Sequence, residues 1–500
     1  MPPPISRFLL LCVTAASLFA AHARAQEPAP LPPPPPNSPV PPPASSSLPN
    51  ASPIADAPVA SSAAPSLFAH PPSARYLISG QANIIFQAHA PFHSPYEGVN
   101  SLVGRGEYKP SLLGTLHLGA RIRNSPRTGT DLILDIESSG GRGISQALGL
   151  AGFTNLDVVR NPSLGSKPYI ARIQLHQTIG LSRKLVPKLV PVDRTQFSLA
   201  TQAPERRLEL HIGKMSLPDF LDLNSSGSDS HLQFMNWTAD NNGAWDYAAD
   251  TRGYTYAAVA EYIVRTWSAR YALALMPTVA NGVKLDWNLR RASGQTFELE
   301  LRRPLLGGLL RPNREGVVRA LAFVNHANMG VYRTSNRNFD LGITPSPVIT
   351  AHPPQTSVKY GFGLNFEQEI APGLNSFGRF GWNEGQHESF AYTEVDQTVQ
   401  IGADLTGSRW SRPHDKLGLT LISNAIKRDH QQYLALGGQG FLLGDGRLHY
   451  AREDILETYY TLHTWRGLYY ALDAQFIEHP GYNRDRGPVL VESVRMHIDF

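Results

Sequence analysis

The sequence predicts an all-β fold, a transmembrane antiparallel β-barrel of about 16 strands with long loops. Three observations predict it. From Arg75 onward, apolar and polar residues alternate at period two in stretches of about five to eleven residues. No apolar run reaches the roughly 18 residues of a membrane-spanning helix. The chain starts with the pattern of an export signal and ends in an alternating stretch that closes on an aromatic residue, Phe500.

The first 25 residues have the layout of a secretory signal peptide. Arg7 precedes the mostly apolar run Phe8–Ala20, and Ala23, Arg24 and Ala25 supply the small-x-small pattern of a cleavage site. We therefore expect the mature chain to begin near Gln26. The single cysteine of the sequence lies within this signal, so we expect no disulfide and no thiolate metal site in the mature protein.

Residues 26–75 are rich in proline, alanine and serine and carry almost no charge. Such a segment cannot bury enough apolar surface to offset its ordering entropy, and proline runs favour an extended backbone. The sequence predicts a disordered linker here, followed by the barrel in residues 76–500. The role of the linker is left open.

The alternating stretches place ionisable residues and glycine on one face and aliphatic or aromatic residues on the other. A soluble sandwich with one dry face would also alternate. The charged face suits a water-filled lumen, and within lipid only a closed barrel satisfies every backbone group of a strand. Bacterial barrels have even strand numbers, and about 16 strands leave an aqueous channel. Tyrosines are expected near strand ends as interfacial girdles, for example Tyr254, Tyr256, Tyr459 and Tyr460.

The densest polar and aromatic stretch is Ser228–Tyr256. Planar donors and acceptors match pairs of sugar hydroxyls, and flat aromatic rings cover the apolar face of a pyranose. The alternative is a surface loop whose Asn, Asp and Gly only set turns. The candidate binding residues in this stretch are Trp237, Asp240, Asn241, Asn242, Trp245, Asp246 and Arg252.

A second set of candidates consists of charged residues on the polar faces of predicted strands. Charged side chains around a pore set its selectivity, although each of them could equally be a solvated wall residue. The set comprises Arg121, Arg123, Arg172, Glu298, Glu300 and Arg302.

Catalytic and metal signatures are weak, so the sequence predicts no enzyme, no cofactor and no metal site. Pro91 argues against a helix that would bring His89 and His93 together, and a strand would separate them by roughly 13 Å. Glu298 and Glu300 share one strand face and cannot easily flank a glycosidic bond. No basic stretch interleaved with aromatic residues indicates nucleic-acid binding.

Several ordered segments resemble the OprB-type carbohydrate-selective porins, and the likeness spans most of residues 79–500. The resemblance implies a 16-stranded outer-membrane porin that passes glucose and related sugars by diffusion through a narrow eyelet. The individual eyelet positions of that family cannot be assigned in this sequence. The segments are Ser79–Gly98, Ala147–Gly165, Ser228–Tyr256, Tyr360–Ile370, Phe377–Gly385 and His479–Val491.

The leading expectation is thus a bacterial outer-membrane protein that contacts lipid and small carbohydrates, as a monomer or a homotrimer. The terminal strand that ends in Phe500 is expected to be recognised by the barrel-assembly machinery. Two other functions stay open at this stage: a secreted or periplasmic β-rich glycan hydrolase or binding protein, and an outer-membrane export component. The sequence specifies neither the preferred sugar nor the loop that narrows the pore.

Overall fold

The structure is a computed structural model that describes residues 66–158, 164–183, 186–303 and 316–500. The predicted signal peptide lies outside the described residues, as does most of the predicted linker. The described part of the linker, residues 66–75, forms no helix or strand, and the first strand begins at Tyr76. No helix in the described ranges is long and apolar enough to cross a membrane.

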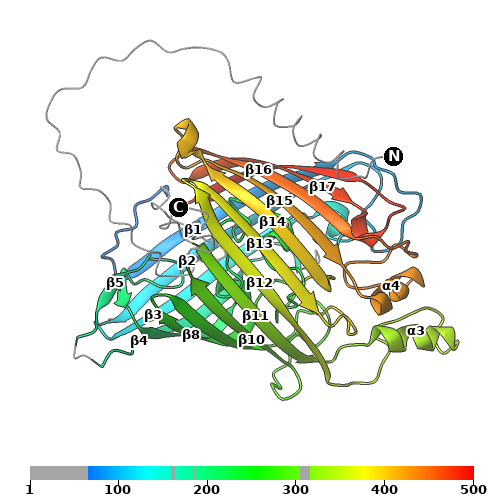
Figure 1. Cartoon of the computed structure of the whole chain (residues 1–500), viewed down its shortest axis with the longest axis horizontal. Coiled ribbons are helices and arrows are strands. Elements are labelled where there is room, and N and C mark those ends of the chain that lie inside the picture. The colour runs from blue at the N-terminus through cyan, green and yellow to red at the C-terminus, as the bar shows by residue number, and fades with distance from the viewer. Residues whose placement is uncertain (1–65, 159–163, 184–185, 304–315) are drawn as a thin grey trace, which may run out of the picture. The chain divides into compact units, whose positions relative to one another are not determined.

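Sixteen antiparallel strands close into a barrel, each paired with its neighbours along the chain, and β1 pairs with β18 (Figure 1). The predicted fold class and strand number are therefore confirmed. The strands of the barrel are β1 (Tyr76–His89), β2 (Glu107–Asn124), β3 (Thr128–Gly141), β4 (Tyr169–Gly180), β7 (Arg207–Met215), β8 (Thr255–Val264), β9 (Trp267–Leu275), β10 (Ser293–Arg302), β11 (Gly316–Ala327), β12 (Ser357–Ala371), β13 (Leu374–Asn383), β14 (Gln397–Thr406), β15 (Lys416–Ala425), β16 (Glu453–Trp465), β17 (Leu468–Glu478) and β18 (Val489–Asp499).

The remaining elements lie in the connections between these strands. Two short strands form a separate hairpin between β4 and β7, and four 3-10 turns and three short helices complete the described elements. They are β5 (Leu189–Pro191), β6 (Gln202–Pro204), η1 (Ile144–Gln146), η3 (Leu217–Asp219), η4 (Gly407–Trp410), η5 (Pro480–Tyr482), α2 (Trp237–Asp240), α3 (Tyr332–Asp340) and α4 (Arg428–Ala435).

The two faces of each strand differ in the way that the alternation predicts. On β10, Phe297 is 49% exposed on the outer face, whereas Glu298 and Glu300 are almost fully buried on the inner face. Aliphatic and aromatic side chains form the outer wall on the other strands as well, for example Leu132, Phe362 and Leu472. An apolar outer wall with a polar inner wall is the arrangement of a barrel set in lipid.

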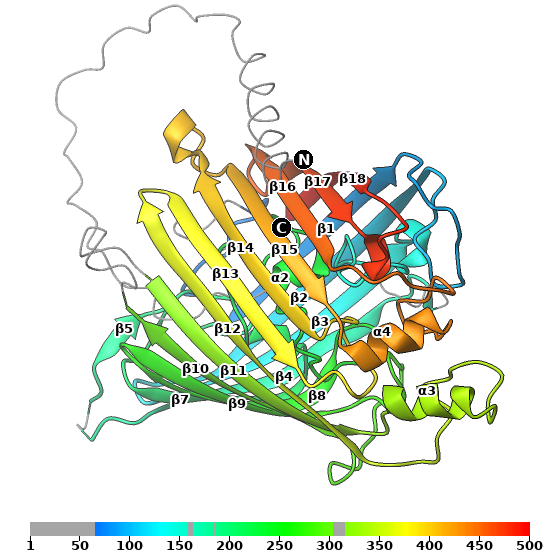
Figure 2. The same cartoon turned by 45° about the vertical axis from the view of Figure 1, so that its right-hand side comes forward.

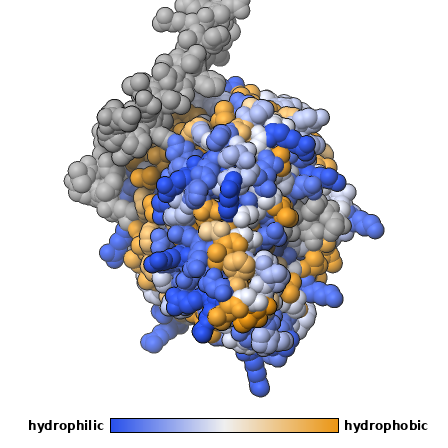
Figure 3. Space-filling model, turned by 90° about the vertical axis from the view of Figure 1, so that its right-hand side faces the viewer, coloured by the Kyte–Doolittle hydropathy of each residue, from blue (hydrophilic) through white to orange (hydrophobic). Residues whose placement is uncertain are grey.

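Because consecutive strands run antiparallel, alternate connections lie at the same end of the barrel. Most of the long connections lie at one end, and the other end carries the short turns together with the long connection 181–206. In Figures 1 and 2, α3 and α4 lie at the end with the long connections, and β5 lies at the opposite end. Figure 3 looks onto the end that carries α3 and α4, where hydrophilic residues dominate and hydrophobic ones gather toward the lower part and the margins.

Two long connections fold into the barrel. Residues 216–254, between β7 and β8, are buried along nearly their whole length, and α2 in their middle lies inside the ring of strands (Figure 2). We call this stretch the inner loop. The described residues 142–158, between β3 and β4, form a second inward segment. Apolar residues of both segments build a core within the lumen, which includes Phe153, Phe234 and Trp245.

The tyrosines expected at strand ends take different positions. Tyr459 and Tyr460 lie in the middle of β16, where Tyr459 faces inward and packs its ring edge-to-face against Phe234. Tyr254 is buried at the end of the inner loop, and Tyr256 packs against Trp287 on the outer side of β8. The predicted position at a strand end is therefore right for Tyr254 and Tyr256, which flank the first residue of β8, and wrong for Tyr459 and Tyr460.

Candidate functional site

Inner-wall side chains hold the inner loop through its backbone. Glu457 accepts hydrogen bonds from the amides of Met235 at 2.6 Å and Asn236 at 3.2 Å. Arg495 donates to the carbonyls of Ser230 at 2.5 Å and Gln233 at 3.0 Å. These bonds satisfy backbone groups that have no strand or long helix to pair with, as burial requires.

The other side of the inner loop is fixed in the same manner. Arg379 donates to the carbonyl of Ala239 at 2.6 Å and to the Ser228 hydroxyl at 2.7 Å. The ammonium group of Lys359 lies 3.1 Å from Asp246, whose carboxylate also accepts the amides of Phe390 and Ala391. The loop is therefore tied to well-separated parts of the wall and cannot shift without breaking several buried bonds.

Local sequence signals shape the two turns of helix in the inner loop. Ser216 and Asp219 form a capping box around η3, in which Pro218 occupies an early position. Asn236 caps α2 by accepting a hydrogen bond from the Thr238 amide at 3.0 Å. These caps fix the two turns of helix that carry Asp219, Trp237 and Asp240.

The two inward segments meet at Trp237. Its backbone amide donates to the carbonyl of Phe153 at 2.8 Å, and its indole nitrogen donates to the carbonyl of Asn155 at 2.9 Å. Across the same contact, His231 Nε2 lies 3.1 Å from Asp157 Oδ1. Burial alone would raise the pKa of Asp157, but the charge and hydrogen bond of His231 hold that pKa below its ordinary value.

A cavity of about 130 Å³ lies between the two segments and the wall of β1, β2, β3 and β4. One side is aromatic, where the Trp237 and Tyr392 rings stack with centroids 5.6 Å apart, and Tyr247 packs against Tyr392 at 4.6 Å. The other side is charged. Its acidic and basic residues are Glu137, Asp157, Arg172, Asp219, His231, Asp240, Asp250 and Arg252.

The charged side of the cavity is pre-organised by pairing. Arg172 donates two hydrogen bonds of 2.7 Å to Asp219, and the guanidinium of Arg252 lies 3.8 Å above the ring of Tyr169. Both Tyr169 and Tyr254 donate their hydroxyl protons to Glu137. Burial raises the pKa of Asp250, although two backbone amides stabilise its charged form.

The comparisons with known proteins agree with this architecture. The family model described as "Carbohydrate-selective porin, OprB family" matches residues 130–500. The chain belongs to the OprB family of carbohydrate-selective porins. It is therefore an outer-membrane channel and not an enzyme, so the prediction of a non-enzymatic porin is confirmed.

Solved structures are similar to this porin to different degrees, and the first of the two described below shares its fold. The structure described as Pseudomonas putida OprB at high pH matches with a TM-score of 0.63 at 15% identity, over 85% of this chain and 94% of that chain. The outer-membrane channel DcaP of Acinetobacter baumannii matches with a TM-score of 0.46 at 8% identity, over 87% of this chain and all of that chain. A search of curated proteins finds no match.

The structure brings five of the predicted site residues of this porin together. They line the cavity from β4 and the inner loop, and they are Arg172, Trp237, Asp240, Asn241 and Arg252. Sequence reasoning did not single out Tyr392, Glu137 or Asp157. The period-two alternation that places Asp135 on the inner face extends to Glu137, but no local signal places Tyr392 beside Trp237.

Three further candidates of the inner loop lie outside the cavity lining and contact protein instead. The backbone amide of Asn242 donates to the Asp222 carboxylate at 2.7 Å. Trp245 is fully buried in the lumen core. Asp246 is bound by Lys359. Their contacts shape the loop.

Apart from Arg172, the charged candidates on the strands lie either on β2 or in an ion-pair network on β8–β12. Arg121 pairs with Asp131 at 3.5 Å inside the barrel, whereas Arg123 is exposed at the end of β2, after a register shift. Glu298, Glu300 and Arg302 belong to an ion-pair network on the inner wall of β8–β12. Glu300 there accepts from the guanidinium groups of Arg270 at 3.0 Å, Arg302 at 2.7 Å and Arg319 at 2.8 Å.

Proposed function

We propose that small neutral sugars of glucose size diffuse through this porin by way of the cavity between the two inward segments. A sugar ring would lie against the aromatic side formed by Trp237, Tyr247 and Tyr392, with its hydroxyls toward the charged side. Aromatic faces contribute roughly 0.5–1.5 kcal/mol beyond area burial. Such an affinity is weak enough for a molecule to enter and leave.

The observation that carries this proposal is a set of buried donors that line the cavity without a hydrogen-bond partner in the described structure. They are Asn241 Nδ2, Thr251 Oγ1 and Arg252 Nη1. Buried polar groups in proteins are nearly always paired, so groups left unpaired beside a cavity point to a ligand or water. Sugar hydroxyls both accept and donate hydrogen bonds, and they would complete this set.

Liposome swelling with the purified porin tests the proposal. We expect glucose to enter faster than an uncharged polyol of similar mass. Trp237→Ala should reduce that preference several-fold, because it removes the ring that supports the sugar face. Trp287→Ala is the matched control, since Trp287 is 69% exposed on an outer loop.

Equal entry of all small neutral solutes would contradict selective sugar passage. The same result for Trp237→Ala and wild type, in folded protein of normal heat-shifted gel mobility, would remove Trp237 from the site. The Trp287→Ala variant should behave as wild type in both assays.

We further propose that residues 1–25 are an export signal removed during secretion, that residues 26–75 form a linker, and that the strand ending in Phe500 is recognised by the assembly machinery. Amino-terminal sequencing of protein from the outer membrane should then begin near Gln26. Native mass measurement in detergent distinguishes a monomer from a homotrimer.

A further inference from the structure

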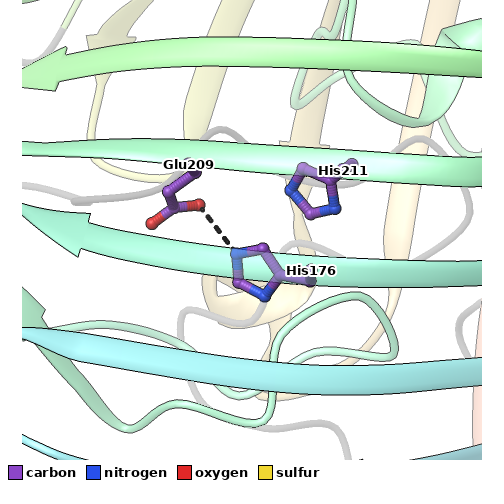
Figure 4. Close-up of side chains that lie close together, drawn as sticks. All are labelled: His176, Glu209 and His211. Carbon is purple, nitrogen blue, oxygen red and sulfur yellow. Dashed lines mark ion pairs between the residues drawn. The ribbon is translucent and has the colours of Figure 1, made fainter.

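Two histidines and one glutamate meet on the inner wall near the end with the short turns. His176 on β4 and His211 on β7 are direct register partners, and Glu209 precedes His211 by two residues on the same strand. Directly opposed residues lie about 5 Å apart at Cβ, and residues two apart on a strand share a face. Figure 4 shows the three side chains converging from the two strands.

The potential ligand atoms of these side chains all lie within 4.8 Å of one another. His176 Nε2 is 3.5 Å from Glu209 Oε2, and Figure 4 marks this pair. Ligands at the usual Zn²⁺ distances of about 2.0–2.2 Å are separated by about 3.3 Å in a tetrahedral site. Movements of about 1 Å, together with a rotation of one imidazole out of its parallel stack on the other, would bring the three atoms onto one ion.

A carboxylate behind the cluster orients His176. Its Nδ1 lies 3.1 Å from Asp131 Oδ2, and Asp131 also accepts the Leu199 amide at 3.2 Å. A histidine whose Nδ1–H is given to a carboxylate presents its Nε2 lone pair on the opposite side. This is the support that metal-bound histidines usually have.

His211 supplies an independent observation. Its side chain is almost fully buried, and its Nδ1 has no hydrogen-bond partner in the described structure. One ring face stacks on His176 at 4.3 Å and 5°, and Phe220 packs against His211 at 4.3 Å. Leaving an imidazole nitrogen buried and unpaired destabilises the folded protein. An ion pair between His176 and its two acids does not explain this arrangement, because it gives His211 no partner.

We propose that His176, Glu209 and His211 form a binding site for a divalent transition-metal ion of the Zn²⁺ class. Two imidazoles and one carboxylate are a common set for such ions, with water in the fourth position. The ion would link β4 to β7, and it would lie next to Phe220, which directly follows η3 and the cavity residue Asp219. This inference does not depend on the proposed passage of sugars.

The sequence did not indicate this cluster, because its members lie on separate strands. Only the β4–β7 register brings His176 opposite His211, and the 26 intervening residues 181–206 give no signal of that register.

The test is a titration of the full-length porin, without an affinity tag, with Co²⁺ followed by Zn²⁺. We expect visible Co²⁺ absorption bands that saturate near one ion per chain, and we expect Zn²⁺ to displace the Co²⁺. His176→Ala and His211→Ala should each abolish the saturable signal. Asp131→Asn should weaken binding roughly 10- to 100-fold, because it removes the orienting carboxylate.

His117→Ala is the matched control. His117 is also buried on the inner wall and pairs with a carboxylate, Asp135, at 3.1 Å, but it does not belong to the cluster. The His117→Ala variant should bind Co²⁺ as the wild type does. If an alanine variant fails to fold, Glu209→Gln, which keeps the side-chain shape, replaces it in the Co²⁺ titration. The absence of saturable binding to the wild type, or undiminished binding to folded His211→Ala, would overturn the proposal.

Discussion

Among single residues, Arg172 organises the largest part of the candidate site. Besides its two bonds to Asp219, it lies 3.3 Å from Asp135 and 5.2 Å from the ring centres of Phe197 and Tyr254. Arginine suits this position because its planar guanidinium can bind a carboxylate at two points and stack on rings simultaneously. The residue therefore joins the wall, the η3 turn and the aromatic lining.

Replacing Arg172 by alanine should destabilise the folded porin by about 3–5 kcal/mol, because Asp219 would lose its bidentate partner while it remains buried. Urea unfolding in detergent, followed by heat-shifted gel mobility, measures the loss. The double variant Arg172→Met with Asp219→Asn should recover the part of the loss that is due to Asp219, and Asp135, which also loses Arg172, still has His117 at 3.1 Å. Equal losses for the single and double variants would show that packing, not charge, dominates at this position.

Single residues also show which side chains of the site can be identified from the sequence. Trp237, Asp240, Asn241 and Arg252 are close together in one polar and aromatic stretch, so composition alone indicates them. Tyr392 belongs to another loop and reaches Trp237 only through the folded barrel. Trp245 has the same composition signal as Trp237 but is used as core. Composition therefore identifies the loop without separating its ligands from its packing residues.

At the scale of elements, strands were predictable and loops were not. A strand between lipid and water must alternate, so residues such as Phe297 and Glu298 reveal their faces in the sequence. The inner loop has no period, because side chains of distant strands satisfy its backbone one group at a time. Its path depends on partners that are remote in sequence, so its inward fold could be expected only from its length.

The loop between β13 and β14 has a pH-dependent contact. Glu388 accepts the Gly330 amide at 3.0 Å, and burial raises its pKa to about 7, helped by the negative charge of Asp246 and opposed by that amide and Lys359. A carboxyl whose pKa is raised on folding leaves stability unaffected below its unfolded pKa. It lowers stability as pH rises from about 4.5 to 7, and the loss is constant above that range.

Glu388→Gln should therefore stabilise this loop at pH 8 and have little effect at pH 4, with a difference of about 3 kcal/mol at most. Hydrogen exchange of residues 384–396, corrected for intrinsic rates, measures it at both pH values. Asp340→Asn, on the exposed end of α3, is the control and should show no such change between pH 4 and pH 8. A pH-independent effect of Glu388→Gln would contradict the titration.

At the scale of the whole molecule, the barrel is closed where its first strand pairs with its last. β1 pairs with β18 from Gln81 with Asp499 to His89 with Val491. Gly80 and Phe500 exchange two backbone hydrogen bonds of 2.7 and 2.8 Å beyond this ladder. The described end of the linker joins the same corner, where the Leu67 amide donates to the Asp499 carbonyl at 2.9 Å. Closure leaves no unpaired strand edge in lipid.

Gly80 is where this closure is most sensitive to added volume. A Cβ atom there would lie 2.6 Å from the Phe500 ring and 2.6 Å from the Thr115 carbonyl oxygen, which is backbone and cannot turn away. Gly80→Ala should therefore destabilise the closed barrel by about 1–3 kcal/mol, as overpacking does. The loss should appear as a smaller fraction of the heat-shifted gel form after refolding into detergent.

Gly114→Ala provides the comparison within the same sheet. Gly114 lies on β2, which pairs with β1, and a Cβ atom there would come no closer than 4.0 Å to any heavy atom beyond Gly114 and its two neighbours in the chain. Its refolded fraction should equal or exceed that of wild type, since alanine restricts the unfolded chain more than glycine does. If the two alanine variants refold equally well, neither the Phe500 ring nor the Thr115 carbonyl oxygen is fixed against Gly80, and the predicted overpacking at the β1–β18 closure is wrong.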